Sequence, residues 1–335
     1  MSLLSPSFLK SQYSNLPIPP ASSFAGRTYI VTGANIGLGF ECAKHLVGFS
    51  AKRVIIAVRS EARGAEAKAK IEAETGRKGI VEVWILDLGS FDSVKSFATR
   101  ACNEIERIDG LIENASIALS DWTVTEGLET TLTVNVLGTF LLAMLLLPKM
   151  KADAKKSGVR SNPVIVGSNL GYMGNEGLLE SIDGDMFNAL NVKDRWPLGN
   201  ARYGLSKLLQ SYLARQLSTL LPVADTNVVI NYLSPGLCKT GLTRHASLKM
   251  RIQVGAANAL LGRTAEMGNR TLLHAVSAGP ETHGNLLDDC KVKESVIPTW
   301  VTNADGRMTQ ERVWSQVTAR LEKIEPGCVS KVVGT

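Results

Sequence analysis

A tyrosine and a lysine stand four residues apart, at Tyr203 and Lys207, in a stretch that reads as a helix. Residues at this spacing share one helix face. A free tyrosine has a pKa of about 10 and is a poor base at neutral pH. A nearby ammonium favours the phenolate, so we expect Lys207 to lower the pKa of Tyr203 and make it a general acid or base. Taken alone, the pair also fits an aromatic ring packed on a lysine stem.

Three glycines form a second pattern, in the run TGANIGLG at residues 32–39. The run lies between a β-branched segment and a helix-like segment. Glycine allows a sharp turn and a close backbone approach to a ligand, and the following helix offers its N-terminus to a phosphate. The spacing differs from the standard G-x-G-x-x-G fingerprint. We predict a nucleotide site here, with a tight turn that binds nothing as the alternative.

The elements that must position these residues alternate along the chain. Strand-like runs occur at 28–31, 53–58, 81–86, 111–114, 164–167 and 228–233, and helix-like runs at 60–75, 90–105, 126–150, 201–221 and 263–278. Repeated βα units imply a parallel sheet with helices on both faces. We therefore predict an α/β fold, a single Rossmann-type doubly wound sheet of about seven strands. Ligands of such sheets bind beyond the carboxyl ends of the strands.

We expect the residues after the second and third strands to contact the adenosine half of a cofactor. Arg59 follows the second strand, where an acidic residue would hold the ribose of NAD and an arginine accommodates the 2′-phosphate of NADP. A surface arginine is the alternative, although a cation at a helix start is mildly unfavourable. We expect NADP(H) rather than NAD(H). Asp87 and Leu88 follow the third strand, where the carboxylate could meet the adenine or cap the next helix.

In combination these residues resemble the short-chain dehydrogenase/reductase family, over about residues 26–290. The motifs that carry the resemblance are the glycine run at 32–39, Asn114-Ala115, Asn135, Ser168, Tyr203-x-x-x-Lys207 and Pro235-Gly236-x-x-x-Thr240. Each motif is weak alone, but together they occur in order on the expected elements. The runs at 35–39 and 58–60 look most like the branch that contains retinol dehydrogenases and related fungal carbonyl reductases.

The resemblance implies a role for each catalytic-type residue. Tyr203 would exchange a proton with the substrate oxygen, and Ser168 would hydrogen-bond that oxygen. Lys207 would lower the pKa of the tyrosine and hold the ribose, Asn135 would keep a water in a proton relay, and Thr240 would hold the nicotinamide amide. The expected cofactor site comprises Gly33, Asn35, Ile36, Gly37, Leu38, Gly39, Arg59, Asp87, Leu88, Asn114, Ala115, Tyr203, Lys207, Pro235, Gly236 and Thr240.

Two positions depart from the family pattern Asn-Asn-Ala-Gly. Glu113 replaces the first asparagine and Ser116 replaces the glycine. We expect the charge of Glu113 and the side chain of Ser116 to shift the position or affinity of the cofactor. Binding itself should survive, because Asn114 and Ala115 remain.

The stretch between Ser168 and Tyr203 is longer than in compact family members. Long loops in compact domains are usually functional or disordered. We expect residues 169–200 to form one wall of the substrate pocket and residues 237–262 the other. The candidate substrate-binding residues are Tyr172, Met173, Trp196, Leu237 and Leu242. Deleting part of 172–196 should raise the KM for substrate far more than it disturbs NADP(H) binding.

Three segments make up the predicted organisation. Residues 1–25 carry four prolines and several serines and read as an extended arm. Residues 26–294 form the catalytic domain. Residues 295–335 form a C-terminal helical extension that packs on this domain or contacts a second subunit, so a homodimer and a monomer are both compatible with the sequence.

Composition narrows the partners. The net charge of the 335 residues is +6, and the basic residues are scattered, which disfavours nucleic acid as a partner. Five separated cysteines form no metal or disulfide pattern and fit a reducing compartment, so we expect a cytoplasmic location and no metal. The apolar run at 140–147 is far too short to span a membrane, and the N-terminus lacks a signal peptide pattern.

The predicted function is NADP(H)-dependent hydride transfer between nicotinamide and a lipophilic ketone, aldehyde or secondary alcohol, with Tyr203 as general acid or base. Steroids, retinoids, polyketides and terpenoids all qualify as substrates. One alternative is a non-redox protein that retains the cofactor site. Another is a lyase, cyclase or isomerase that uses the same pocket. A Tyr203→Phe variant discriminates, because only the oxidoreductase should lose NADPH oxidation while it keeps the cofactor.

Overall fold

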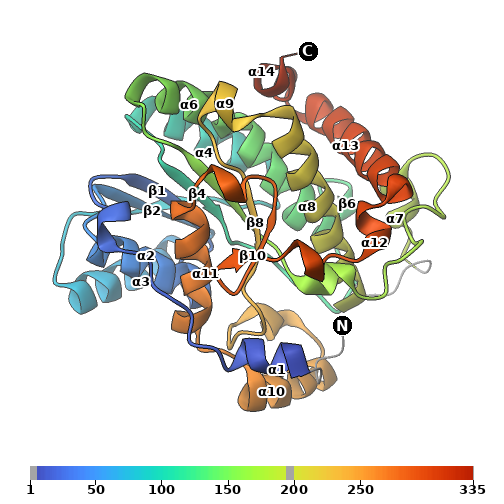
Figure 1. The fold of residues 1–335 in the computed structure, drawn as a ribbon, viewed down its shortest axis with the longest axis horizontal. Helices are drawn as coiled ribbons and strands as arrows, with labels where there is room; N and C mark the ends of the chain where they lie inside the picture. Colours follow the sequence, from blue (N-terminus) through green and yellow to red (C-terminus); the bar gives the residue numbers. More distant parts are fainter. Residues whose placement is uncertain (1–5, 194–199, 335) are drawn as a thin grey trace.

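The computed structural model describes residues 6–193 and 200–334, which fold around one central sheet (Figure 1). Seven strands run parallel in the order β9-β8-β7-β4-β1-β2-β3, and a short eighth strand, β10, pairs antiparallel with β9. The strands are β1 (Thr28–Thr32), β2 (Arg53–Val58), β3 (Val81–Ile85), β4 (Gly110–Glu113), β7 (Asn162–Val166), β8 (Asn231–Ser234), β9 (Leu286–Asp288) and β10 (Lys291–Val292). The prediction of a doubly wound Rossmann-type sheet is confirmed, with the returning edge strand as an addition.

Helices cover both faces of the sheet. One face carries α2 (Gly37–Gly48), α3 (Glu61–Thr75) and α11 (Ala265–Ser277), and the other carries α4 (Phe91–Glu104), α6 (Thr139–Ser157) and α8 (Asn200–Leu220). Successive residues of β1 point to opposite faces, so Ile30 joins one apolar core while Tyr29 and Val31 join the other. A parallel sheet buried on both faces explains why its strands are apolar without a polar alternation.

The long apolar helix begins later than predicted. A hairpin of β5 (Val124–Thr125) and β6 (Leu128–Glu129) precedes it, because Glu126 and Gly127 both have positive φ, which a right-handed helix does not allow. The helical path then runs through α5 (Thr130–Leu132) and the π-helical η2 (Thr133–Gly138) into α6.

Helix α6 also extends further than predicted, through Pro148 to Ser157. The helical stretch at 130–157 is long and apolar enough to cross a membrane by composition. However, 89% of its most apolar window is buried inside the fold, which is typical of a core helix in a globular protein.

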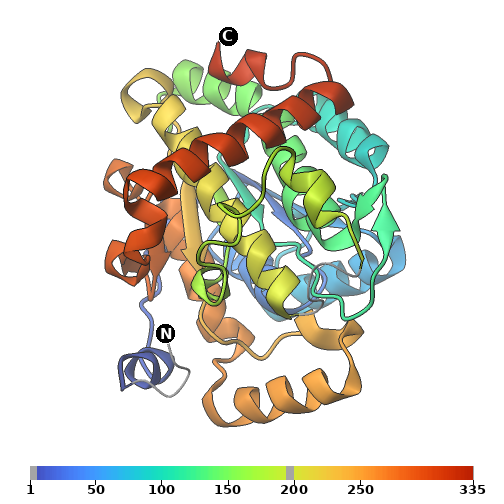
Figure 2. The ribbon, with the colours of Figure 1, turned by 90° about the vertical axis from the view of Figure 1, so that its right-hand side faces the viewer.

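The predicted extended arm contains a helix, α1 (Pro6–Gln12), and a single turn, η1 (Ala21–Ser23). Proline is well suited to the first position of a helix, because its fixed φ is helical and its missing N–H has no helical partner there. Pro6 therefore begins the helix and does not keep residues 6–12 extended. Helix α1 lies beside α10 (Leu248–Leu261), outside the two helical layers that cover the sheet (Figures 1 and 2).

The C-terminal residues form α12 (Thr299–Thr302), α13 (Ala304–Ile324) and α14 (Ser330–Val333). Helix α13 crosses the outside of α8 (Figure 2). Val313, Val317 and Leu321 are fully buried there and share the apolar core that α8 faces. The remaining short helices are η3 (Asn169–Tyr172), α7 (Met186–Leu190), α9 (Val223–Thr226), η4 (Leu242–His245), η5 (Pro280–Thr282) and η6 (Glu294–Val296).

Candidate active site

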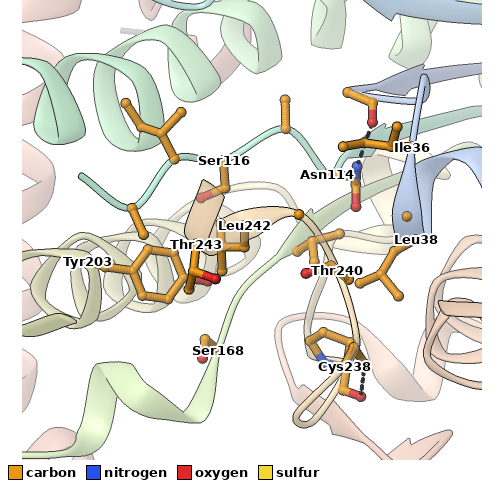
Figure 3. A pocket seen from close by; sticks show the side chains of 18 of the residues that line it. Ile36, Leu38, Asn114, Ser116, Ser168, Tyr203, Cys238, Thr240, Leu242 and Thr243 are labelled. Atoms are coloured by element: carbon orange, nitrogen blue, oxygen red, sulfur yellow. Dashed lines mark hydrogen bonds between the residues drawn. The ribbon is translucent and has the colours of Figure 1, made fainter. Parts of the chain in front are cut away.

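A cavity of about 500 Å³ lies beyond the carboxyl ends of the strands. Tyr203 and Ser168 stand at one end and Ile36, Leu38 and Asn114 at the other (Figure 3). The predicted site residues that line it are Gly33, Asn35, Ile36, Gly37, Leu38, Arg59, Asp87, Leu88, Asn114, Ala115, Ser168, Met173, Tyr203, Lys207, Pro235, Gly236, Leu237, Thr240 and Leu242. The strands thus bring together residues that are up to 209 positions apart in the chain (Gly33 to Leu242).

Four predicted residues are not part of this lining. Gly39, Asn135 and Tyr172 lie behind the wall, and Trp196 falls outside the described residues. Tyr172 is buried, and its hydroxyl is 2.8 Å from the Ser211 hydroxyl. Tyr172 is therefore not placed in the cavity lining, where we expected it. Its ring fills the core beneath α8 instead.

The glycine run builds a concave surface that other residues could not form. Gly33 has a φ of +66°, and a Cβ there would lie 3.0 Å from the Cα of Ala115. Gly39 has no room for a Cβ either, since it would lie 2.6 Å from Asn114 Nδ2. Helix α2 starts after Ile36 without a side-chain cap, so its first N–H groups are not satisfied by a capping side chain.

Asn114 and Ala115 hold the strand ends together. The Asn114 Nδ2 donates to the carbonyl of Thr32 at 2.9 Å, and the Ala115 N–H donates to the Thr32 hydroxyl at 2.9 Å. The end of β4 is thereby tied to the start of the glycine run. Asp87 also lines the cavity, while its Oδ1 accepts from the Gly89 N–H and Ser90 caps α4.

Three arginines lie close together in the cavity lining, away from Tyr203. Arg59 follows β2, Arg63 is in the first turn of α3, and Arg244 is in η4 on the opposite wall. Partial burial and then the like charges of Arg59 and Arg63 lower the pKa of Arg244. Among the described residues, no carboxylate lies within ion-pair distance of Arg59 or Arg63. Such a cluster is suited to an anion with more than one negative charge.

Tyr203 lines the other end of the cavity, and its side chain is largely buried. Burial raises the pKa of Tyr203 above its usual value, and a hydrogen bond with the Ser168 side chain partly offsets this. We expected the opposite direction, caused by Lys207. The phenol is therefore held in its protonated form, which is the form that donates a proton.

Lys207 forms its hydrogen bonds with groups other than the phenolic oxygen. Its Nζ lies 5.4 Å from the centre of the Tyr203 ring and donates to the Val166 carbonyl at 2.8 Å and to Gln210 Oε1 at 3.0 Å. Burial lowers the pKa of Lys207 to about 7. The ammonium that would stabilise a phenolate is thus itself only marginally stable in this environment.

Asn135 takes part in a polar network behind the cavity. Its Oδ1 accepts from the Ile117 N–H at 3.0 Å, and its Nδ2 donates to the Ile117 carbonyl and to the Ser206 hydroxyl. Gln210 Nε2 donates to the Asn135 carbonyl at 2.5 Å. Gln210 therefore connects Lys207 to Asn135 directly, a link that the sequence analysis did not identify.

The two departures from the family pattern have different surroundings. Glu113 is buried, with no hydrogen-bond partner for its Oε1 in the described part of the chain, and burial raises its pKa well above the usual range. A neutral acid replaces the charge that we expected. Ser116 does line the cavity, and its buried hydroxyl has no partner among the described residues (Figure 3).

The insert before Tyr203 contributes little to the wall. Within the described residues 169–193, Asn169, Leu170 and Met173 line the cavity, but Met186, Phe187 and Leu190 of α7 are buried in the core that α13 covers. Deleting part of 172–196 is thus expected to disturb folding as well as substrate binding. The opposite wall carries more residues than expected, because Gln253, Val254, Ala257 and Asn258 of α10 join Leu237 and Leu242.

Sequence reasoning missed Phe8 and Arg63 as lining residues, whereas Arg244 lies in the wall expected at 237–262. Arg63 could have been found, because it follows Arg59 by four residues at a helix start. Phe8 had no such signal, since it lies in a proline-rich segment far from any motif. No group of three or more metal-binding side chains occurs within the described residues.

Comparison with known proteins agrees with this geometry. Residues 27–179 match the family model described as short chain dehydrogenase. The short chain dehydrogenase/reductase dmxR8 of Cryptosporiopsis sp. is 37% identical over 96% of this chain and 99% of its own length. The short chain dehydrogenase atnD of Emericella nidulans is 42% identical over 84% of this chain and 90% of its own length.

A solved short-chain dehydrogenase from Sphingobium yanoikuyae, in complex with NADPH, shares the fold. Its TM-score is 0.55 at 21% identity, with 74% of this chain and 82% of that chain covered. The match to dmxR8 runs almost end to end, and in this chain the glycine run and Ser168 at the strand ends line one cavity with Tyr203 and Lys207 of α8. The chain belongs to the short-chain dehydrogenase/reductase family of oxidoreductases.

Proposed function

We propose that this enzyme reduces a lipophilic ketone or aldehyde with NADPH. The observation that carries the proposal is one continuous cavity with the arginine cluster at one end and the protonated Tyr203 beside Ser168 at the other. An anion site and a proton donor at opposite ends of one cavity fit a dinucleotide whose nicotinamide faces a carbonyl.

The chain's own residues fit NADP(H). The glycine surface at Gly33 and the uncapped start of α2 would receive the pyrophosphate. Arg59, Arg63 and Arg244 would surround the 2′-phosphate, which an arginine accommodates in this fold. The bound cofactor supplies the hydride, while the protein supplies placement and electrostatics. The solved relative from Sphingobium yanoikuyae is a complex with NADPH, in agreement with this assignment.

Tyr203 and Ser168 would handle the substrate oxygen. The Ser168 hydroxyl would hydrogen-bond the carbonyl oxygen and orient it. Tyr203, kept protonated by burial, would donate its proton as negative charge develops there. Gln210 and Lys207 would hold the surrounding network in place.

An apolar lining supports a lipophilic substrate. The side chains that contribute it include Phe8, Ile117, Ala118, Val134, Leu170, Met173, Leu237, Leu242, Val254 and Ala257. Burial of apolar surface stabilises such a complex by about 25 cal/mol for each Å² removed from water.

The test is a panel of lipophilic carbonyl compounds with purified enzyme, followed by NADPH absorbance, with NADH in parallel. We expect turnover with NADPH and much less with NADH. Tyr203→Phe should lower kcat/KM by about 10³-fold and leave the NADPH dissociation constant unchanged. Equal turnover with NADH would refute the cofactor preference. Substantial reduction by Tyr203→Phe would refute the proposed role of the tyrosine.

A further inference from the structure

We propose that the N-terminal helix α1 is part of the substrate site, with Phe8 as a specificity-determining wall and Gln12 as a positioning residue for the 237–262 wall. The inference deepens the proposed function and rests on it for the identity of the reaction. It is carried by the contacts of Gln12, Ser11 and Phe8.

Gln12 joins the two ends of the 237–262 wall. Its Nε2 donates to the carbonyls of Leu237 and Leu261, each at 2.9 Å, and its Oε1 accepts from the Leu237 N–H at 3.1 Å. The side chain is only 5% exposed. Both donor hydrogens and the acceptor of the amide are thus used on one segment, and only an amide of this length offers both donors and an acceptor there.

The side-chain amide of Gln12 also packs against Gly236, the residue that follows Pro235. Gly236 has a φ of +76°, and a Cβ there would lie 2.5 Å from Gln12 Oε1. The chain leaves β8 through this glycine and enters the wall. Gln12 therefore packs at the hinge between the sheet and the wall as well as bonding to the wall.

A buried ion pair fixes α1 to the sheet edge. The guanidinium of Arg263 pairs with Asp289 and donates to the Ser11 carbonyl, and the Ser11 hydroxyl donates to Asp289 at 2.8 Å. Arg263 is 3% exposed. Tyr13 adds a bond from its hydroxyl to the Leu260 carbonyl at 2.9 Å. Helix α1 is consequently placed relative to both β9 and α10.

This placement directs Phe8 into the cavity, one helical turn before Gln12. Phe8 lines the same cavity as Tyr203, Leu237 and Val254. An aromatic side chain at this point removes space that a substrate could otherwise occupy, and it adds apolar contact for a substrate that fits. Phe8 should therefore set the size of the accepted carbonyl compound, while Gln12 sets how well the wall is held.

The test compares Phe8→Ala and Gln12→Ala with Lys10→Ala, an exposed position on the same helix. Wild type and variants are assayed with one small and one bulky carbonyl substrate. Phe8→Ala should shift the ratio of kcat/KM for bulky over small substrate by about tenfold in favour of the bulky one. The NADPH dissociation constant should not change. Phe8→Leu, a milder variant, should shift the ratio in the same direction by less.

For Gln12→Ala we expect a raised KM for substrate and an NADPH dissociation constant within about twofold of wild type. A readout independent of activity is limited trypsin digestion. Release of the wall should speed cleavage after Lys239, Arg244, Lys249 or Arg251, which mass spectrometry locates. Lys10→Ala should match wild type in every assay.

The outcomes separate the two proposals. If wild type reduces no carbonyl compound with either cofactor, the proposed function fails, and the trypsin assay still tests the role of Gln12. If wild type is active but Phe8→Ala and Phe8→Leu keep its substrate ratio, the role of Phe8 is refuted. If Gln12→Ala lowers only Tm, with unchanged KM and unchanged cleavage rates, Gln12 is a stability residue and the inference about the wall is refuted.

Discussion

The two ends of the cavity are built in contrasting ways. At the proposed cofactor end, Gly33 and Gly39 pack so closely against Ala115 and Asn114 that a single methyl group would clash. At the substrate end, α10 has no buried residue, and its Leu248, Ile252 and Leu260 are 70%, 63% and 74% exposed. A tightly packed surface faces a loosely supported helix across one cavity.

The difference follows from what each end must recognise. A dinucleotide has one shape, so a surface of fixed backbone atoms can be complementary to it. A substrate wall is attached by a few contacts, among them those of Gln12, and it can be altered without disturbing the sheet. We therefore expect substitutions at the cofactor end to affect binding and stability together, and substitutions in α10 to affect substrate selection alone.

A glycine-to-alanine substitution at each end of the cavity tests this contrast, which is wrong if both substitutions have the same effect. In Gly39→Ala the new Cβ would lie 2.6 Å from Asn114 Nδ2 and 2.9 Å from the Gly33 carbonyl. We expect the NADPH dissociation constant to rise about 100-fold, with a lower Tm, because overpacking costs about 1–3 kcal/mol. Gly255→Ala in α10 meets no atom within 4 Å and should leave NADPH binding unchanged. Fluorescence titration and thermal denaturation measure both effects.

The Arg59→Gln variant tests whether the proposed adenosine end of the cavity recognises the 2′-phosphate of NADPH. Loss of a charge-assisted bond of about 2 kcal/mol should raise the KM for NADPH about 30-fold and leave that for NADH unchanged. Arg244→Gln should have a smaller effect of the same sign, because Arg244 lies on the wall. Lys70→Gln, on the exposed side of α3, serves as control. Equal KM changes for both cofactors would contradict a 2′-phosphate site.

The pH dependence of the enzyme's stability tests whether Lys207, at the reactive end, is as tightly buried as the structure places it. Burial lowers the pKa of Lys207 to about 7, so its charged form destabilises the folded state at and below that pH. The wild-type enzyme should gain stability as the pH rises from about 7 towards 10. Lys207→Met lacks this titration. Its Tm minus that of wild type should fall by about 5 °C over this range, and a constant difference would contradict the lowered pKa.

Glu113 gives the smallest expected effect. Burial raises its pKa well above the usual range, so the folded state keeps a proton that the unfolded state loses. Wild-type stability should therefore fall as the pH rises above about 5. Glu113→Gln is neutral throughout, and its Tm relative to wild type should increase by about 2 °C between pH 5 and pH 8. Calorimetry at both pH values would show a flat difference if Glu113 were ionised in the fold.

The same contrast explains what sequence reasoning could reach. The alternation of strands and helices, the glycine run, Arg59 and the Tyr203–Lys207 pair follow from local patterns, and the structure brings these residues to one cavity at the strand ends. Tyr172 was misplaced because nothing local says whether an aromatic residue after a strand faces the cavity or the core. The direction of the Tyr203 pKa was wrong because burial depends on the surrounding fold and not on helix spacing.

The contacts of the N-terminal residues also constrain the order in which the molecule can be completed. The Ser11–Asp289 bond joins positions that are 278 residues apart. Strands β1, β2 and β4, which carry the glycine surface, are all synthesised well before Asp289. The residues around Ser11 are synthesised earlier still, yet their bond to Asp289 needs nearly the whole chain. Because domains generally fold as units during synthesis, we expect the pocket wall that Phe8 contributes to reach its final position only after residue 289 has been added.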